Sequence, residues 1–193
     1  MEKVDKQSSG LECDIYFDGN KHGFDVHHDE DKSIGLNLDD LLQVYQQQVL
    51  QASIWFDFKN LSDSNAVQSL GELVRLQKKY GLFKKMLVES SRVDLLKQFS
   101  DSGFFTSFYT PMFNPYLISD DSIKHLVDSL STLISNSAVN ALSGYYFQCP
   151  FLQHYFPNYP ILIWSPNDRF SLVNWWYKRK IISTKAVFIA LYP

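Results

Sequence analysis

GLECDIYFDGNKHGFDVHHDED, residues 10–31, is the stretch around which the chain is organised. Glu12 and Asp14 lie two positions apart in a run that alternates like a β-strand, so both side chains project from one face, about 7 Å apart along the strand. Two carboxylates on one face repel each other unless a positive group lies between them, and Mg²⁺ and Ca²⁺ both bind oxygen ligands. The His-His-Asp sequence at 27–29 adds a candidate proton-transfer group. The alternative is a solvent-exposed edge strand followed by a polar loop.

The second informative stretch is IWFDFKNL, residues 54–61. Asp57 and Lys59 again lie two positions apart on one face, at the end of an otherwise apolar strand. This repetition favours a cation site over an exposed edge strand. The alternative for Lys59 is a structural ion pair that bridges Asp57 and Glu89.

Composition places the chain among ordinary globular domains. With 193 residues, 45% hydrophobic and 16% aromatic, it can bury a large core, and we expect a single domain over 1–193. The formal net charge of −3 provides no basic field for a nucleic acid. We expect no membrane-spanning segment and no secretory signal, and the compartment stays open. The two cysteines form neither a metal signature nor a disulfide framework.

Strands alternate with helices along the chain, which is typical of parallel βαβ units. We expect seven strands, near 11–17, 53–58, 84–89, 104–109, 138–142, 161–164 and 186–191. Polar or aromatic residues follow nearly every strand, and barrel enzymes place their sites at these carboxyl ends. A doubly wound sheet would concentrate them at one switch point. The sequence therefore predicts a TIM-type (β/α) barrel with about seven strands present and the first βα unit missing or truncated.

The first residues of three of the longer helices can be predicted, and for two of these helices the buried faces can be predicted as well. Asn37 is a candidate N-cap for the first helix. Ser62 or Asp63 is expected to cap the second helix, and Asp120 or Asp121 to begin the third. Helical spacing predicts the buried positions of the last two helices: Val67, Leu70, Leu73, Val74 and Leu76, then Ile123, Leu126, Val127, Leu130, Leu133 and Ile134. Further helical segments are expected at 93–99, 151–156 and 170–178.

The opening stretch resembles the glycerophosphodiester phosphodiesterases and the related phosphatidylinositol-specific phospholipase C-like barrels. In that family a Glu-x-Asp on the second strand precedes a short turn and a His-Asp. Glu12 and Asp14 match the first pair, and His28 with Asp29 match the second.

Later strands extend the resemblance over nearly the whole chain. The family's third strand ends in Glu-x-Lys, which is similar to Asp57 and Lys59 here, with Asp in place of Glu. Its seventh strand runs into Trp-Thr-Val-Asn, similar to the WSPN sequence from Trp164 to Asn167. Its last strand ends near Asp-Tyr-Pro, and the Tyr-Pro at 192–193 lacks the Asp.

The resemblance implies a role for each candidate residue. Glu12, Asp14 and Asp57 would hold a divalent cation, Mg²⁺ or Ca²⁺. Lys59 would add positive charge beside the phosphorus, and His28 would protonate the leaving alkoxide. The expected substrate-binding residues are Glu89, Tyr145, Trp164 and Asn167. Glu89 is alternatively a further ligand or an orienting partner of Lys59, and Trp164 is alternatively a core residue.

One departure from the family bears on activity. Family members begin with a His-Arg-Gly strand and a following Glu-Asn, and nothing before Glu12 matches either motif. The sequence therefore predicts a metal-dependent hydrolase of small-molecule phosphodiesters that is weak or inactive as this chain. The alternative is a non-catalytic metal- or phosphate-binding protein of the same fold. An open seam in the barrel is expected to allow self-association.

Overall fold

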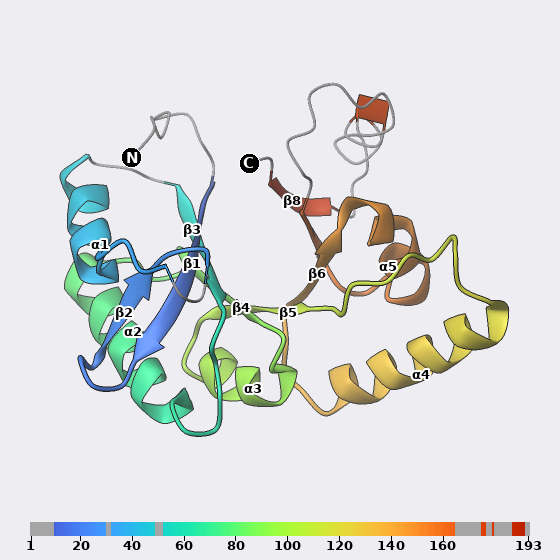
Figure 1. The fold of residues 1–193 in the computed structure, drawn as a ribbon, viewed down its shortest axis with the longest axis horizontal. Coiled ribbons are helices and arrows are strands. Elements are labelled where there is room, and N and C mark those ends of the chain that lie inside the picture. The colour runs from blue at the N-terminus through green and yellow to red at the C-terminus, as the bar shows by residue number, and fades with distance from the viewer. Residues whose placement is uncertain are drawn as a thin grey trace. The chain divides into compact units, whose positions relative to one another are not determined.

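The computed structural model describes most of the chain, namely residues 10–29, 32–48, 52–164, 175–176, 179 and 187–191. It divides into two compact units, residues 1–106 and 107–193 (Figure 1), and each is treated by itself below. The prediction of a single domain stays a prediction. Among the described residues, no helix combines the length and the apolar character needed to cross a membrane.

The sheet of the first unit carries the acidic residues. Strands β1 (Gly10–Asp18), β3 (Ser53–Phe58) and β4 (Met86–Ser90) are parallel and adjacent in that order. Along β1 the burial alternates, because Cys13, Ile15 and Phe17 face the core. The acids at the even positions of β1 therefore share its other face, as the alternation predicted.

A fourth strand was not counted from the sequence. β2 (Gly23–Val26), expected only as a short extended piece, pairs antiparallel with β1 from Ile15↔Val26 to Asp18↔Gly23. The turn at 19–22 joins the two strands into a hairpin. The open seam expected beside the first strand is therefore only partial, because β2 covers the second half of β1. Within the described chain, the outer edge of 10–14 has no strand beside it.

The first helix begins where it was predicted. In α1 (Leu38–Gln47) the side chain of Asn37 accepts a hydrogen bond from the backbone N–H of Asp39 at 2.8 Å. Such a bond satisfies one of the N–H groups that a helix leaves without an internal partner at its first turn. The side chains of Leu38, Leu41 and Leu42 form part of the buried face of this helix. The predicted N-cap was therefore confirmed.

The start of the second helix was wrong. α2 (Ala66–Tyr80) has Asn65 at its N-cap position, three residues after the candidate Ser62 and two after Asp63. The Asn65 side chain accepts from Ser62 N–H and donates to the carbonyl of Asn60, which holds these residues in a turn. The later start leaves Val67, expected in the core, 77% exposed.

The rest of α2 follows the prediction more closely. Leu73 and Leu76 are fully buried, while Leu70 and Val74 are half-buried. Gly81 ends the helix with φ +67°, a left-handed conformation that glycine adopts without steric cost.

An aromatic chain forms much of the core of the first unit. α3 (Val93–Asp101) contributes Phe99, which is fully buried. Edge-to-face ring contacts, with centroids 5.1–6.4 Å apart, join successive members of the series Phe17, Phe24, Phe58, Phe99 and Phe104. These contacts connect the β1–β2 hairpin to β3 and α3, and so fix the strands that carry the acids.

In the second unit, β5 (Phe105–Tyr109), β6 (Ala141–Tyr145), β7 (Ile161–Trp164) and β8 (Val187–Leu191) are parallel in that order; β5 begins two residues before the unit boundary. The strand predicted at 138–142 was placed three residues too early. The chain is still irregular after the preceding helix as far as residue 140, so the strand begins at Ala141. The ends of β7 and β8 agree with the prediction.

Two helices of the second unit lie close to their predicted positions, but one of them buries fewer residues than its periodicity predicted. α4 (Asp120–Ser135) begins where expected, and the Ser119 side chain accepts from Ser122 N–H. Of its six expected core positions only Leu130 and Ile134 are buried. α5 (Cys149–Tyr155) follows the 3₁₀ turn η1 (Tyr146–Gln148) and confirms the short helical segment expected at 151–156, although it begins two residues earlier. The helix expected at 170–178 lies almost wholly outside the described residues.

Candidate functional site

Three carboxylates gather on one face of the first unit's sheet. Asp14 on β1 is the register partner of Asp57 on β3, so the two side chains leave the sheet at the same level. Glu12, two residues before Asp14, shares that face. One oxygen from each of the three lies within 4.8 Å of the other two. The structure therefore brings together the residues that were predicted to bind a cation.

Lys59 lies between two of these carboxylates. Its Nζ is 2.8 Å from Asp14 Oδ1 and 2.5 Å from Asp57 Oδ2. The backbone N–H of Lys59 donates to the carbonyl of Ile15, which fixes the residue beside β1. The ion pair with Asp57 follows from their spacing, whereas the pair with Asp14 depends on the register between strands.

Burial and like charge shape the ionisation of the cluster. Burial, followed by the charges of Asp14 and Asp57, raises the pKa of Glu12 from 4.5 to about 8, although Lys59 opposes the shift. Burial also raises the pKa of Asp57, against the effect of Lys59. For Lys59 itself, burial disfavours the charged form, but Asp57 and Asp14 outweigh burial and raise its pKa.

The donor set fits a hard divalent cation. Glu12 Oε1 is buried and has no hydrogen-bond partner among the described residues. A buried carboxylate oxygen without a partner is costly, and a cation would remove that cost. Carboxylate oxygens are the ligands that Mg²⁺ and Ca²⁺ take in proteins.

Glu89 extends the acidic row onto a third strand. It is the register partner of Asp57 on β4 and is fully buried. Asp14, Asp57 and Glu89 are therefore in register on the adjacent strands β1, β3 and β4.

His28 lies on the corner that follows β2. Its side chain is 82% exposed, and its Nδ1 is 3.0 Å from Asp29 Oδ1. Lys32 Nζ in turn contacts Asp29 Oδ2 at 2.8 Å. Burial and Lys59 have the largest effects on the pKa of Asp57, and a charged His28 acts in the same direction as Lys59, lowering that pKa.

Comparison with solved structures identifies this arrangement of elements. A glycerophosphodiester phosphodiesterase from Parabacteroides distasonis aligns over 95% of this chain and 79% of its own, with a TM-score of 0.62 and 14% identity. A phosphodiesterase from Oleispira antarctica, solved with its product sn-glycerol-3-phosphate, aligns over 97% of this chain and 82% of its own, with a TM-score of 0.64 and 11% identity. The chain has the TIM-type fold of these phosphodiesterases. No protein-family model matches the chain, and none of the curated proteins matches its sequence.

The fold predicted from the resemblance is thereby confirmed. At these identities the comparison concerns the fold, and the roles of individual residues stay predictions. The phosphodiesterase fold nevertheless accounts for the parallel strands whose carboxyl ends carry Asp57 and Glu89.

The remaining predicted residues belong to the second unit. Tyr145 and Trp164 are register partners at the carboxyl ends of β6 and β7. The Tyr145 ring stacks on Phe147 with centroids 5.7 Å apart. Asn167 lies outside the described residues. Tyr145 and Trp164 therefore lie side by side at the carboxyl ends of adjacent strands. Their contact with a substrate stays a prediction.

One further residue beside His28, Tyr16, was missed by sequence reasoning. Tyr16 donates from its hydroxyl to the carbonyl of His28, and the ring of His27 stacks on Tyr16. Tyr16 continues the period-two series of Glu12 and Asp14, so the alternation of β1 could have indicated it. His27 also contacts the backbone, because its Nδ1 lies 2.7 Å from the carbonyl oxygen of Asp29.

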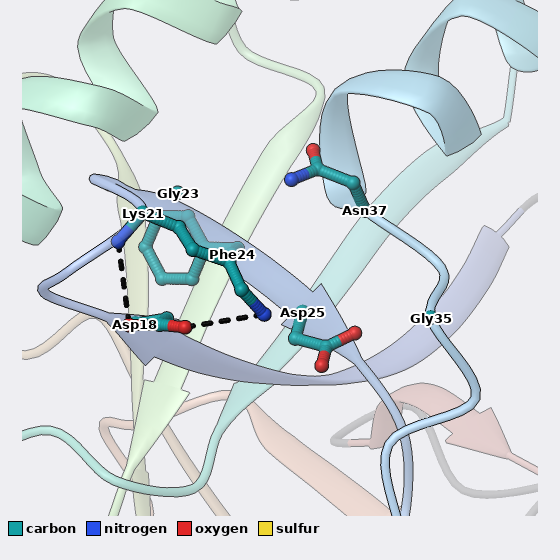
Figure 2. A pocket seen from close by; sticks show the side chains of 7 residues that line it. All are labelled: Asp18, Lys21, Gly23, Phe24, Asp25, Gly35 and Asn37. Atoms are coloured by element: carbon teal, nitrogen blue, oxygen red, sulfur yellow. Dashed lines mark hydrogen bonds and ion pairs between the residues drawn. The ribbon is translucent and has the colours of Figure 1, made fainter.

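A separate pocket of about 150 Å³ opens at the hairpin and the start of α1 (Figure 2). Its lining consists of Asp18, Lys21, Gly23, Phe24, Asp25, Gly35 and Asn37. Figure 2 shows Lys21 bonded to Asp18 through both its backbone and its side chain, which closes the turn. None of the three clustered carboxylates lines this pocket, so it is distinct from the candidate cation site.

Proposed function

We propose that this chain is a hydrolase of glycerophosphodiesters or related small phosphodiesters that depends on Mg²⁺ or Ca²⁺. One observation carries the proposal: oxygens of Glu12, Asp14 and Asp57 lie within 4.8 Å of one another on a phosphodiesterase fold. Lys59 beside them supplies the positive charge that a phosphate requires.

The three carboxylates would hold the cation. Bound there, a divalent cation would withdraw charge from a phosphate oxygen. Glu89, in register with Asp57, is either a further ligand or a residue that orients Lys59. Asp57 is one methylene shorter than the Glu found at this position in the resembling family, so the ligands would lie closer to the strand.

Two other side chains would act on the substrate. Lys59 would bind the phosphate and stabilise the charge that develops on it. His28, exposed on the corner that follows β2, would donate a proton to the leaving alkoxide. Tyr145, Trp164 and Asn167 would bind the alcohol part of the substrate.

We expect the 193-residue chain to hydrolyse these substrates weakly. In the resembling family the partner of His28 in acid–base catalysis belongs to a His-Arg-Gly motif, and that motif does not occur in this sequence. Losing one such group typically costs on the order of 10² to 10⁴ in rate. The same observation favours the second candidate, a metal- or phosphate-binding protein without catalysis.

Thermal melting with added Mg²⁺ or Ca²⁺ tests the cation site. Ligands that bind the folded state raise the melting temperature by mass action. We expect a rise in the wild-type chain and none in Glu12→Ala with Asp14→Ala. Asp40→Ala, which removes an exposed acid on α1, should keep the rise. An equal rise in the double variant would eliminate the proposed site.

Hydrolysis of two substrates then separates the two functions. An alkyl phosphodiester needs a proton on its leaving group, whereas an activated aryl phosphodiester does not. His28→Ala should lower the rate on the alkyl substrate sharply and on the aryl substrate much less. A cation-dependent melting shift without hydrolysis of either substrate would favour the binding protein.

A further inference from the structure

We propose that Tyr16 and His27 are positioning residues that hold the backbone of the corner from which His28 projects. The inference rests on the proposed role of His28 as the proton donor. Nothing in the predicted site assigns a role to either residue.

The two rings form one stacked unit. The ring centroids of Tyr16 and His27 are 4.2 Å apart and the planes differ by 4°. Tyr16 belongs to β1, whereas His27 follows β2, so the stack joins the two strands at the open end of the hairpin. The His27 side chain is only 6% exposed, compared with 82% for His28. Adjacent histidines thus occupy opposite environments.

Each member of the stack binds one carbonyl of the corner. The Tyr16 hydroxyl donates to the carbonyl of His28 at 3.3 Å. His27 Nδ1 lies 2.7 Å from the carbonyl of Asp29. The backbone N–H of Lys32 donates to the same Asp29 carbonyl at 3.0 Å. The two carbonyls that follow the His28 Cα, its own and that of Asp29, are therefore both held by groups outside the His28 side chain.

The contact with Asp29 fixes where the proton of His27 lies. A carbonyl oxygen only accepts, so Nδ1 of His27 must carry the hydrogen. The other nitrogen, Nε2, lies 3.8 Å from Asp25 Oδ2. Nδ1 of His27 thus donates to the backbone, whereas His28 contacts Asp29 through Nδ1 and has its Nε2 available for proton transfer.

The contacts of Tyr16 and His27 with the backbone matter because the exposed side chain of His28 is held by few contacts of its own. Its side-chain contact is with Asp29, which is itself about half exposed. An exposed imidazole on a turn samples many positions, and displacing a catalytic group by about 1 Å can cost on the order of 10²-fold in rate. Holding the backbone of the corner limits that sampling without burying the imidazole.

Three variants separate the hydrogen bonds from the stack. Tyr16→Phe removes only the hydroxyl, and His27→Phe keeps an aromatic ring but removes the Nδ1 donor. His27→Gln keeps an N–H donor, so its rate on an alkyl phosphodiester should fall less than that of His27→Phe. Tyr45→Phe is the matched control, because the Tyr45 hydroxyl also donates to a backbone carbonyl, that of Ala52, at the amino end of β3.

Hydrolysis in the presence of Mg²⁺ gives the first measurement. We expect kcat on an alkyl phosphodiester to fall about tenfold in Tyr16→Phe and in His27→Phe, with KM unchanged. The rate on an activated aryl phosphodiester should stay near that of the wild-type chain, as should both rates in Tyr45→Phe. Equal losses on the two substrates, or no loss on either, would overturn the proposal.

Nuclear magnetic resonance tests the positioning independently of activity. In the ¹⁵N spectrum of the wild-type chain, His27 should be protonated at Nδ1. Amide exchange of Lys32 and backbone motion at His28 should both increase in Tyr16→Phe and His27→Phe, but not in Tyr45→Phe. An unprotonated Nδ1, or an unchanged corner in both variants, would overturn the proposal. If the wild-type chain hydrolyses neither substrate while these spectral changes occur, the function fails and the positioning stands.

Discussion

At the scale of single residues, the charge state of Glu12 depends strongly on its surroundings. Burial and the neighbouring carboxylates raise its pKa to about 8, so its protonated form predominates at neutral pH. In the unfolded chain the same carboxyl ionises near its usual value of 4.5. The folded state therefore binds a proton over the pH range between the two values.

The sign of this difference gives the first prediction. A carboxyl whose pKa is raised on folding contributes stability below about pH 4.5, and that contribution is lost as the pH rises toward 8. Without divalent cations, we expect the free energy of unfolding to fall between pH 5 and 8 by on the order of 2 to 4 kcal/mol from this residue, allowing for its incomplete burial. Glu12→Gln should remove most of the fall, as measured by urea unfolding at several pH values. Identical pH profiles for the two proteins would contradict the prediction.

Lys59 gives the second prediction, because its ammonium occupies the space between two candidate ligands. Nζ contacts both Asp14 and Asp57, so a divalent cation and the lysine attract the same oxygens. We expect Lys59→Met to bind Mg²⁺ about tenfold more tightly at pH 8, since one unit of repelling charge is removed. Without a cation the same variant should melt lower, because the two carboxylates lose their partner.

Isothermal titration calorimetry measures the affinity, and Lys97→Met is the control. Lys97 pairs with Asp101 on the surface of α3, so its removal should change neither the affinity nor the melting temperature appreciably. Weaker binding in Lys59→Met would show that the lysine supports the cation rather than competing with it.

At the scale of elements, α1 and α2 are joined through one carboxylate. Asp39 in the first turn of α1 contacts Arg75 Nη2 at 3.0 Å and Lys79 Nζ at 2.7 Å, and it accepts from the Tyr80 hydroxyl. Burial disfavours its charge, but the hydrogen bonds from Lys79, Tyr80 and Arg75 outweigh burial and lower the pKa of Asp39 to about 2.

The third prediction concerns this junction. A lowered carboxyl pKa contributes stability above about pH 4, and that stability is lost as the pH falls toward 2. We expect Asp39→Asn to cost about 1 kcal/mol at pH 7 and little at pH 2, because the ion pairs are partly screened by solvent. Asp40→Asn, one residue later in the same turn and exposed, should cost less. Equal losses for the two variants at pH 7 would show that the helix dipole, and not the junction, is responsible.

The elements also show what local sequence patterns determine. Alternation placed β1 and β3 well and put Glu12 and Asp14 on one face, because a strand has only two faces. The start of α2 was missed because the Asn65 side chain stabilises a turn where a cap was expected at Ser62. Periodicity indicated the apolar face of α4 but not how much of it the sheet covers, which is a property of tertiary packing.

At the scale of the whole molecule, the order of strands and helices predicted a TIM-type barrel, and the resemblance of short motifs indicated that it is the fold of the phosphodiesterases. The carboxylates and Lys59 were found because each pair, Glu12 with Asp14 and Asp57 with Lys59, lies two positions apart in or directly after one strand. Contacts that need strand register, such as Lys59 with Asp14, could not be predicted. The same holds for the Tyr16–His27 stack, which depends on how the hairpin folds back on itself.

The last prediction concerns association between molecules. β2 pairs with β1 only from Ile15 onward, so the outer edge of 10–14 has no strand beside it in the described chain. Unpaired backbone N–H and C=O groups on a strand edge recruit other strands. We therefore expect the chain to self-associate through this seam, with a mass that rises with concentration in sedimentation experiments.

Charge at the seam should prevent this association, because natural sheets use lysine to protect their edges. At Gly10 an added Cβ meets nothing closer than the Ser53 carbonyl oxygen at 3.7 Å, so Gly10→Lys introduces charge without a clash. Gly71→Lys is the matched control, since Gly71 is exposed on α2 and an added Cβ there meets nothing within 4 Å. We expect Gly10→Lys to remain monomeric at concentrations where the wild-type chain and Gly71→Lys associate. A monomeric wild-type chain at every concentration would rule out the open seam as an interface, and association of all three proteins would place the interface elsewhere on the surface.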